Sequence, residues 1–236
     1  MIAIDYKPLS DYVDMLNKGI SFSFSRYWDG EIECMVGRNG LGYNCDKCHY
    51  TDALQKALLK TIENNYDYYH AVNQPKNNEN TKGLQAQFER LLESLNSKVK
   101  WYDFMVFQYA VETGKFYPML EALKNKMVLF LGGGHLAKIR ELLPNVEFLE
   151  TPATDAFDRL DEIESQVKKR IVNGLVVILC LGMASNVFID DMFPAYGKLI
   201  TMIDMGSAWD ALLGLKTRRW IRKIEPQIMR KNYVKS

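Results

Sequence analysis

Short apolar runs and amphipathic segments alternate through the second half of the chain. The apolar runs predict buried strands at residues 127–131, 146–150, 175–181 and 199–204. The segments between these runs have helical spacing and comprise residues 135–143, 157–172 and 184–193. Apolar strands that end in a turn and lead into a helix are typical of a parallel sheet with helices on both faces, so this half predicts a Rossmann-like fold.

The first half of the chain is richer in helical patterns. Residues 20–26 alternate large apolar side chains with small polar ones and predict a half-buried strand, and the aromatic stretch 101–107 also resembles a strand. Helices are predicted at residues 53–64, 84–96 and 116–125, and a loop at the polar stretch 73–83. The predicted fold class is therefore α/β, with a Rossmann-like, mostly parallel sheet, helices on both faces and a helical insertion in the N-terminal half.

Length and composition favour a single domain. The chain has 236 residues, of which 47% are hydrophobic, and this is enough to bury one sizeable core. Within the domain 1–236 we distinguish a first strand with a helical region (1–125), a Rossmann-like half (126–210) and a basic tail (211–236). The net charge of +1 provides no general field for a polyanion, which argues against nucleic acid as a partner.

The chain carries no pattern of export or membrane insertion. Its first residues lack a basic region followed by a long apolar run, and the longest apolar run, residues 175–183, is far shorter than the ~20 residues of a membrane-spanning helix. The expected location is therefore the cytoplasm, with the inner face of the membrane as a further possibility because of the basic tail.

Three residues near position 45 allow several interpretations. Cys45, Cys48 and His49 match the C-x-x-C-H pattern of haem attachment, and with Cys34 they contain ligands suited to zinc. Haem attachment requires an exported protein, and zinc sites generally have a second ligand pair, which this chain lacks. A polar loop with two free thiols is the simplest interpretation.

Acidic residues follow directly after the first predicted strand. Asp29 and Glu31 are separated by Gly30, and at a strand end this D-x-E spacing would point both carboxylates the same way. Such hard oxygen ligands suit Mg²⁺ or Mn²⁺, which take one or two protein carboxylates together with substrate phosphates. Arg26 would bind the phosphate or hold the carboxylates in place. A solvated acidic turn with an ordinary ion pair explains the spacing equally well.

The loops that follow the later strands supply further candidate residues. Parallel sheets bind ligands beyond the carboxyl ends of their strands, so the loops at 132–135, 151–155, 182–185 and 204–210 should converge on one cleft. The candidates for binding a donor molecule there are Gly132, Gly133, Gly134, His135, Gly182, Ser207 and Asp210. Asp155 and Asp204 are candidates for binding hydroxyl groups or acting as a base, although Asp155 is equally suited to capping a helix, and the glycines to close packing.

Trp209 and the basic tail each allow more than one interpretation. Trp209 either stacks on a ligand ring or anchors the core. From Lys216 onward the tail has eight basic residues and one acidic residue. It would close the cleft with Arg218 or Arg219 near a diphosphate, touch anionic lipid, contact a polynucleotide, or form a solvated helix.

The acidic motif also resembles a known family, the glycosyltransferases of the GT-D fold, which carry an R-[YF]-G-D-G-E motif at the end of their first strand. The matching residues are Arg26, Tyr27, Asp29, Gly30 and Glu31, with Trp28 in place of the usual glycine. The resemblance continues through residues 127–134, 151–157, 181–182 and 203–208 and is weak in the helical middle.

The resemblance implies a catalytic domain that uses a nucleotide sugar, often a UDP-sugar, with a divalent metal held by Asp29 and Glu31. The acceptor would be a glycan, a lipid-linked molecule or another acceptor. Two alternatives remain. A methyltransferase would use the glycine turn together with Glu150 as a ribose-binding acid, and a non-catalytic module would bind a partner through residues 73–83 and the basic tail.

Overall fold

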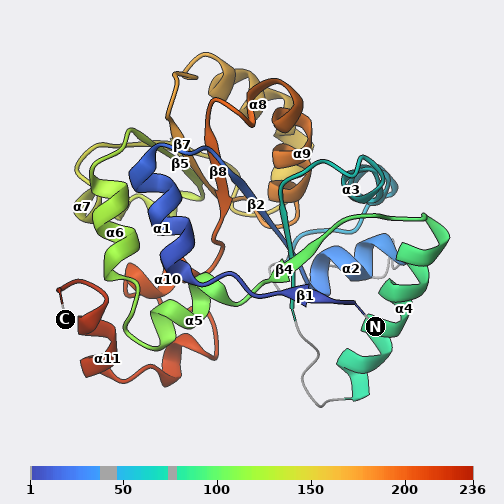
Figure 1. The fold of residues 1–236 in the computed structure, drawn as a ribbon, viewed down its shortest axis with the longest axis horizontal. Helices are drawn as coiled ribbons and strands as arrows, with labels where there is room; N and C mark the ends of the chain where they lie inside the picture. The colour runs from blue at the N-terminus through green and yellow to red at the C-terminus, as the bar shows by residue number, and fades with distance from the viewer. Residues whose placement is uncertain (1, 38–46, 74–78, 236) are drawn as a thin grey trace.

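The protein is built around one sheet of eight parallel strands. The computed structural model describes residues 2–37, 47–73 and 79–235, and the strand order is β1-β4-β3-β2-β8-β7-β5-β6. All seven pairings between neighbouring strands are parallel. The sequence ranges 1–125 and 126–210 each contribute four strands to this sheet, which confirms the Rossmann-like α/β prediction (Figure 1).

Helices cover both faces of the sheet, and each face has its own hydrophobic core. One layer contains α2 (Asp29–Met35), α3 (Asp52–Glu63), α4 (Glu79–Ser94), α8 (Leu160–Lys168) and α9 (Ala184–Tyr196). The other contains α1 (Leu9–Lys18), α5 (Val106–Glu112), α6 (Tyr117–Lys124), α7 (Ile139–Leu142) and α10 (Ala208–Leu212). Along β5 the side chains alternate between the two cores, so this strand is apolar on both faces.

The strands of the second half lie close to the predicted positions. They are β5 (Val128–Gly132), β6 (Val146–Glu150), β7 (Val176–Cys180) and β8 (Thr201–Asp204). The predicted helices begin differently, because short 3₁₀ turns at Gly134–Leu136 and Ala156–Arg159 precede α7 and α8. The prediction of a continuous helix over 135–143 was therefore wrong.

The first half contains more regular structure than its sequence pattern indicates. The strands are β1 (Ile4–Asp5), β2 (Ser23–Tyr27), β3 (Tyr69–Val72) and β4 (Trp101–Asp103). The predicted loop at 73–83 is partly helical, since α4 begins at Glu79, while residues 74–78 lie outside the described residues. The predicted strand at 101–107 ends at Asp103, and α5 follows.

The order of the strands creates a crevice between β2 and β8. β2 leads into α2 on one face of the sheet, whereas its neighbour β8 leads into α10 on the other face. The neighbours β5 and β7 diverge in the same way, toward α7 and α9. Ligands of open parallel sheets bind where adjacent strands diverge like this, so the fold places a site at the carboxyl ends of β2 and β8.

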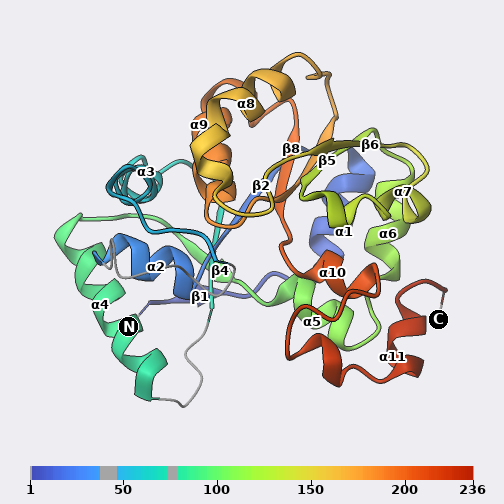
Figure 2. The ribbon, with the colours of Figure 1, turned by 180° about the vertical axis from the view of Figure 1, so that it is seen from behind.

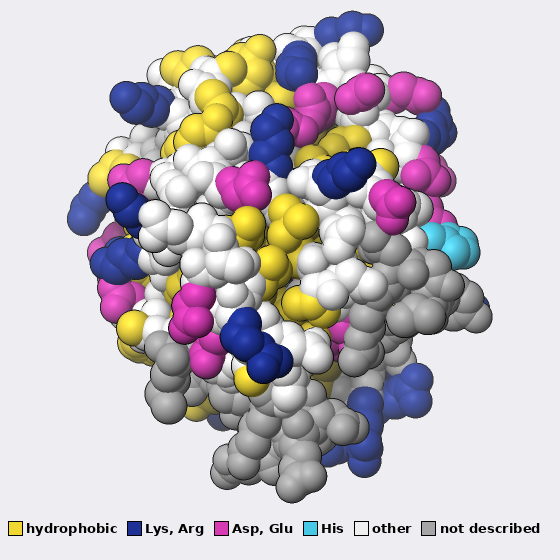
Figure 3. Space-filling model, turned by 90° about the vertical axis from the view of Figure 1, so that its right-hand side faces the viewer, with side chains coloured by type: hydrophobic (Ala, Val, Ile, Leu, Met, Phe, Trp, Pro, Cys, Tyr) yellow, Lys and Arg dark blue, Asp and Glu magenta, His cyan; other side chains and the backbone are white. Residues whose placement is uncertain are grey.

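The C-terminal segment ends with α11 (Pro226–Lys231) and lies beside α5, while the N-terminus lies near α4 (Figure 2). On the face toward α3 and α4, acidic and basic side chains are interspersed (Figure 3). Among the helices of the described residues, none is both long and apolar enough to cross a membrane.

Candidate active site

A cleft with a volume of about 580 Å³ opens at the carboxyl ends of the strands. It lies at the predicted convergence of loops, and its size is typical of small-molecule sites. The predicted residues that line it are Arg26, Asp29, Glu31, Gly133, His135, Gly182, Asp204, Ser207 and Asp210. Three other predicted residues, Gly132, Gly134 and Asp155, do not line it.

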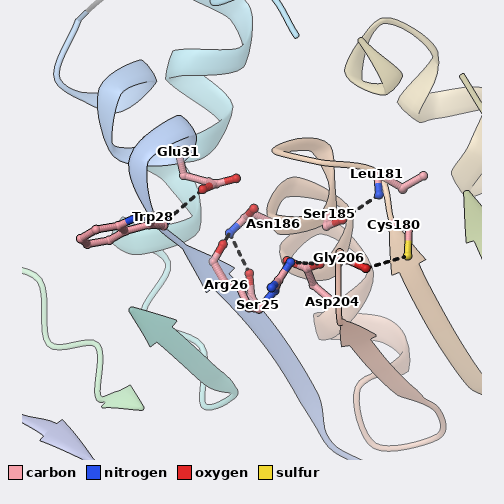
Figure 4. Close-up of polar contacts among 10 residues, drawn as sticks. All are labelled: Ser25, Arg26, Trp28, Glu31, Cys180, Leu181, Ser185, Asn186, Asp204 and Gly206. Carbon is pink, nitrogen blue, oxygen red and sulfur yellow. Dashed lines mark hydrogen bonds and ion pairs between the residues drawn. The ribbon is translucent and has the colours of Figure 1, made fainter. Parts of the chain in front are cut away.

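An ion pair joins the two central strands at the base of the cleft. From β2, Arg26 donates through Nε and Nη2 to the two carboxylate oxygens of Asp204 on β8, each at 3.2 Å (Figure 4). The two side chains are only 14% and 7% exposed, and the guanidinium also lies 4.7 Å from the ring of Phe104. Burial raises the pKa of Asp204, and the charge of Arg26 opposes that shift. Both carboxylate oxygens of Asp204 are therefore engaged by Arg26, and its role as a base or hydroxyl ligand stays a prediction.

Backbone and amide groups hold this pair in position. Gly206 has φ of +45°, and a Cβ there would lie 1.9 Å from Nη2 of Arg26. Asn186 of α9 donates to the carbonyl of Arg26 at 2.6 Å and to the hydroxyl of Ser25 at 3.0 Å (Figure 4). Buried hydrogen bonds of this kind fix the chain that carries the arginine.

The two acidic residues of the motif lie in the first turn of α2 and not at the end of a strand. β2 ends at Tyr27, and Trp28 is the N-cap. The prediction that the two residues stand at a strand end was therefore wrong, and in a helix the side chains of residues two apart do not face each other. Oε2 of Glu31 accepts a hydrogen bond from the Trp28 N–H at 3.0 Å (Figure 4). Asp29 is exposed. Both residues nevertheless line the cleft.

The surroundings of Glu31 favour its neutral form. Burial raises the pKa of Glu31 to about 7, and the negative charges of Asp204 and Asp29 add to the increase, while the Trp28 N–H opposes it. A carboxyl group with this pKa is partly protonated at neutral pH, and a cation bound nearby would favour its ionised form.

These residues fit a divalent cation only if a substrate supplies further ligands. The described residues include no group of three or more His, Cys, Asp or Glu side chains that could hold a metal ion. Asp29 and Glu31 provide hard oxygen ligands, and the cleft leaves room for phosphate oxygens. Mg²⁺ commonly binds to one or two carboxylates plus substrate phosphates, so the donor set fits that kind of site.

The glycine turn after β5 serves mainly for packing. Gly132 is the last residue of β5, and a Cβ there would lie 2.8 Å from Leu136. At Gly134 a Cβ would lie 2.7 Å from the Glu150 carboxylate. Gly133 alone of the three lines the cleft, and His135 is exposed at its edge. The structure that follows is a single 3₁₀ turn, so the predicted helix N-terminus for a phosphate is absent from this part of the described chain.

Asp155 lies beside the cleft and binds His49. Its carboxylate accepts from the His49 backbone N–H at 2.7 Å and contacts Nδ1 at 2.8 Å. Asp155 has φ of +52°, a conformation that is unfavourable for most residues and is held here by these contacts. Capping by the side chain was wrong, because the Asp155 carboxylate makes no cap hydrogen bond, and the predicted role in binding hydroxyl groups or as a base stays a prediction. Of the possible zinc ligands, Cys45 lies outside the described residues.

Some of the lining was not predicted from the sequence. These residues come from the ends of β3 and β4, from α5 (Val106–Glu112) and from the C-terminal segment: Asn73, Phe104, Met105, Gln108, Thr217 and Trp220. Arg218 also lines the cleft, as one interpretation of the basic tail predicted. Trp209, by contrast, is fully buried against Phe116 and Phe130 and is a core anchor. If the loop after every strand is expected to line the cleft, the residues after β4 are predicted as well. The basic composition of the tail indicated Arg218, but no local sequence pattern predicts that Thr217 and Trp220 line the cleft.

Comparison with known proteins supports the fold. The sequence matches no protein-family model and no curated protein. Among solved structures, the chain is similar to the selenomethionine-substituted structure of a domain of unknown function 1792. The TM-score is 0.63 at 17% sequence identity, and the match covers 90% of this chain and 83% of that one. Nearly the whole length of this chain therefore shares the fold of that domain.

Proposed function

We propose that the protein is a metal-dependent glycosyltransferase that moves a sugar from a nucleotide sugar, a UDP-sugar in our proposal, to a glycan or lipid-linked acceptor. The observation that carries the proposal is the position of Asp29 and Glu31. Both line a cleft at the diverging strands β2 and β8, and the motif that contains them resembles that of the GT-D glycosyltransferases. The overall fold agrees with this assignment.

The proposed chemistry explains the distribution of charged groups. Glycosyl transfer breaks the bond between a sugar carbon and a diphosphate, so negative charge develops on the leaving group. Asp29 and Glu31 would hold Mn²⁺ or Mg²⁺, which supplies charge stabilisation when it is bound. Arg26 and Asp204 fix the floor between the strands, while Ser207, Gly133 and Gly182 bound the space for the donor. Asp210 is our choice for the base that accepts the proton of the acceptor hydroxyl.

The methyltransferase alternative receives less support. It requires Glu150 to bind a ribose, but this residue lies against Gly134 and is not among the residues that line the cleft. It also gives no role to Asp29 and Glu31. The proposal of a non-catalytic module likewise leaves these carboxylates without a role.

A thermal-shift panel tests the proposal. A nucleoside diphosphate with Mn²⁺ at one hundred times its Kd should raise Tm by roughly 5–10 °C. Asp29→Asn should abolish the metal-dependent part of the shift. Asp52→Asn is the matched control, because Asp52 is also exposed at the first position of a helix, and it should leave the shift unchanged.

A donor screen with metal identifies the donor, and the thermal-shift panel separates the competing classes. Release of nucleoside diphosphate from one sugar donor would fix the donor. Stabilisation by S-adenosylmethionine without metal would reverse the assignment in favour of a methyltransferase. If Asp29→Asn keeps the full activity of the protein in cells, the protein acts without this chemistry.

We further propose contact with anionic lipid at the inner face of the membrane, where a lipid-linked acceptor would be reached. The exposed basic residues of the C-terminal segment are Lys216, Arg219, Arg222, Lys223, Arg230, Lys231 and Lys235. Sedimentation with phosphatidylserine vesicles should exceed that with neutral vesicles, and Arg222→Glu with Lys223→Glu should reduce it. Equal sedimentation with both vesicles would refute the contact.

A further inference from the structure

The C-terminal segment forms one wall of the cleft. After α10 the chain turns back, and Thr217, Arg218 and Trp220 line the same cleft as Asp29 and Glu31. The Thr217 hydroxyl bonds to the carboxylate of Asp210, which fixes the point where the segment enters the wall. The positions of Thr217, Arg218 and Trp220 agree with the interpretation that the tail closes the cleft, whereas Arg219 is exposed.

The far end of this segment is anchored in the core. Asn232 is 0% exposed, and its amide accepts from the Phe116 N–H at 3.0 Å and donates to the Val111 carbonyl at 2.9 Å. The hydroxyl of Tyr233 donates to the Leu212 carbonyl at 2.5 Å. The segment is therefore held at Thr217 and again at Asn232, and it leads from α10 to α11, which lies against α5 (Figure 2).

The two walls belong to opposite layers of the molecule. Trp28, next to Asp29, packs against the core beneath α2 and α9, whereas Trp220 packs against the core beneath α5 and α10. A ligand in the cleft therefore meets Asp29 and Glu31 from one layer, and Arg218, Trp220 and Asp210 from the other. A diphosphate bound to a divalent cation matches this arrangement of charges. The cation would face the carboxylates, and the diphosphate oxygens that do not bind the cation would require cationic hydrogen-bond donors.

Net charge alone would not hold such an anion here. The described lining residues include four carboxylates, Asp29, Glu31, Asp204 and Asp210, and three cationic side chains, Arg26, Lys47 and Arg218. The charge of Arg26 is balanced by the bidentate pair with Asp204. Lys47 is exposed, whereas Arg218 is partly buried. Partly buried charges interact more strongly, and the five N–H donors of a guanidinium can serve more than one oxygen ligand.

We propose that Arg218 and Trp220 form the subsite for the diphosphate of the donor, with Arg218 binding the phosphate oxygens and the Trp220 indole packing against an adjoining ring of the donor. This inference rests on the proposed function and specifies which residues bind its donor. Arg26, by contrast, has a structural role beneath Gly206.

Calorimetric titration of the full chain with inorganic pyrophosphate and Mn²⁺ tests the proposal. Arg218→Ala should weaken pyrophosphate binding about tenfold or more, and Arg218→Lys should recover part of the loss by restoring the charge without the bidentate geometry. Arg219→Ala is the matched control, because Arg219 is the exposed neighbour and does not line the cleft. It should bind as the wild type does.

The outcomes separate this proposal from the proposed function. Unchanged binding by Arg218→Ala, equal losses in Arg218→Ala and Arg219→Ala, or no binding of pyrophosphate by the wild type would each overturn the subsite. If Arg218→Ala proves poorly folded, the comparison of Arg218→Lys with the wild type decides. Binding of pyrophosphate through Arg218 without binding of any nucleoside diphosphate would keep the subsite and refute the glycosyltransferase.

Discussion

Replacing Gly206 by alanine should disrupt the floor of the cleft. The added Cβ would lie 1.9 Å from Nη2 and 2.9 Å from Cζ of Arg26, both far inside contact distance. Arg26 has little freedom to withdraw, because two hydrogen bonds of 3.2 Å tie it to Asp204 and its guanidinium lies over Phe104. A movement that relieves the overlap must therefore break at least one bond of the ion pair.

Two contributions set the expected loss of stability. Alanine in the left-handed region costs about 1 kcal/mol relative to glycine. Loss of a buried hydrogen bond between charged groups adds about 2–4 kcal/mol, so the free energy of unfolding should fall by about 3–5 kcal/mol in total. Gly214→Ala is the matched control, because φ at Gly214 is +74° and no atom lies within 4 Å of a Cβ there. It should cost only about 1 kcal/mol.

Urea denaturation followed by circular dichroism measures both variants. The midpoint should decrease much more for Gly206→Ala than for Gly214→Ala, with the same dependence on urea concentration in both. Equal decreases would refute the reasoning, because they would mean that Arg26 moves aside without losing its pairing.

Two further predictions concern titratable groups. Burial raises the pKa of Glu31 to about 7, so the folded protein loses stability as the pH rises from about 4.5 through 7. At pH 8 Glu31→Gln should therefore be more stable than the wild type by about 1–3 kcal/mol. The same variant should bind metal and diphosphate less well. Burial lowers the pKa of His70 to about 4, so protonation favours the unfolded chain between pH 6.5 and 4. Compared with His70→Gln, the wild type should lose about 3 kcal/mol more on acidification from pH 7 to 4.5 in urea titrations, and parallel pH curves would contradict this.

The second half of the fold could be predicted because its signals are local. β5 is a run of five buried residues, β7 is a run of four buried residues followed by the half-buried Cys180, and both end at a turn. β1 and β3 have two and four residues, too few for a periodic pattern. β1 is a strand through its pairing with β4, and β3 through its pairing with β2 and β4. Tertiary pairing, which a single sequence does not display, decides such short strands.

The helix α2 was missed for a different reason. Glu31 bonds back to the N–H of residue 28 as in a capping box, but the N-cap is a tryptophan in place of the usual serine or threonine. The spacing between Trp28 and Glu31 was the available signal. The cleft residues that follow β2, β5, β7 and β8 were predictable, and the basic tail indicated Arg218, whereas nothing in the local sequence indicated Thr217 and Trp220.

The electrostatics of the carboxylates favour a functional role over a structural one. Asp29 and Glu31 lie at the N-terminus of a helix, where the helix dipole stabilises acidic groups by about 0.3–1 kcal/mol. Burial and neighbouring negative charges outweigh this contribution at Glu31, because its pKa rises to about 7. The arrangement therefore destabilises the free protein near neutral pH, and residues selected only for stability would not retain it. A cation bound to Asp29 and Glu31 reverses the sign of this interaction, so the same carboxylates that weaken the free fold would stabilise a complex with metal and diphosphate.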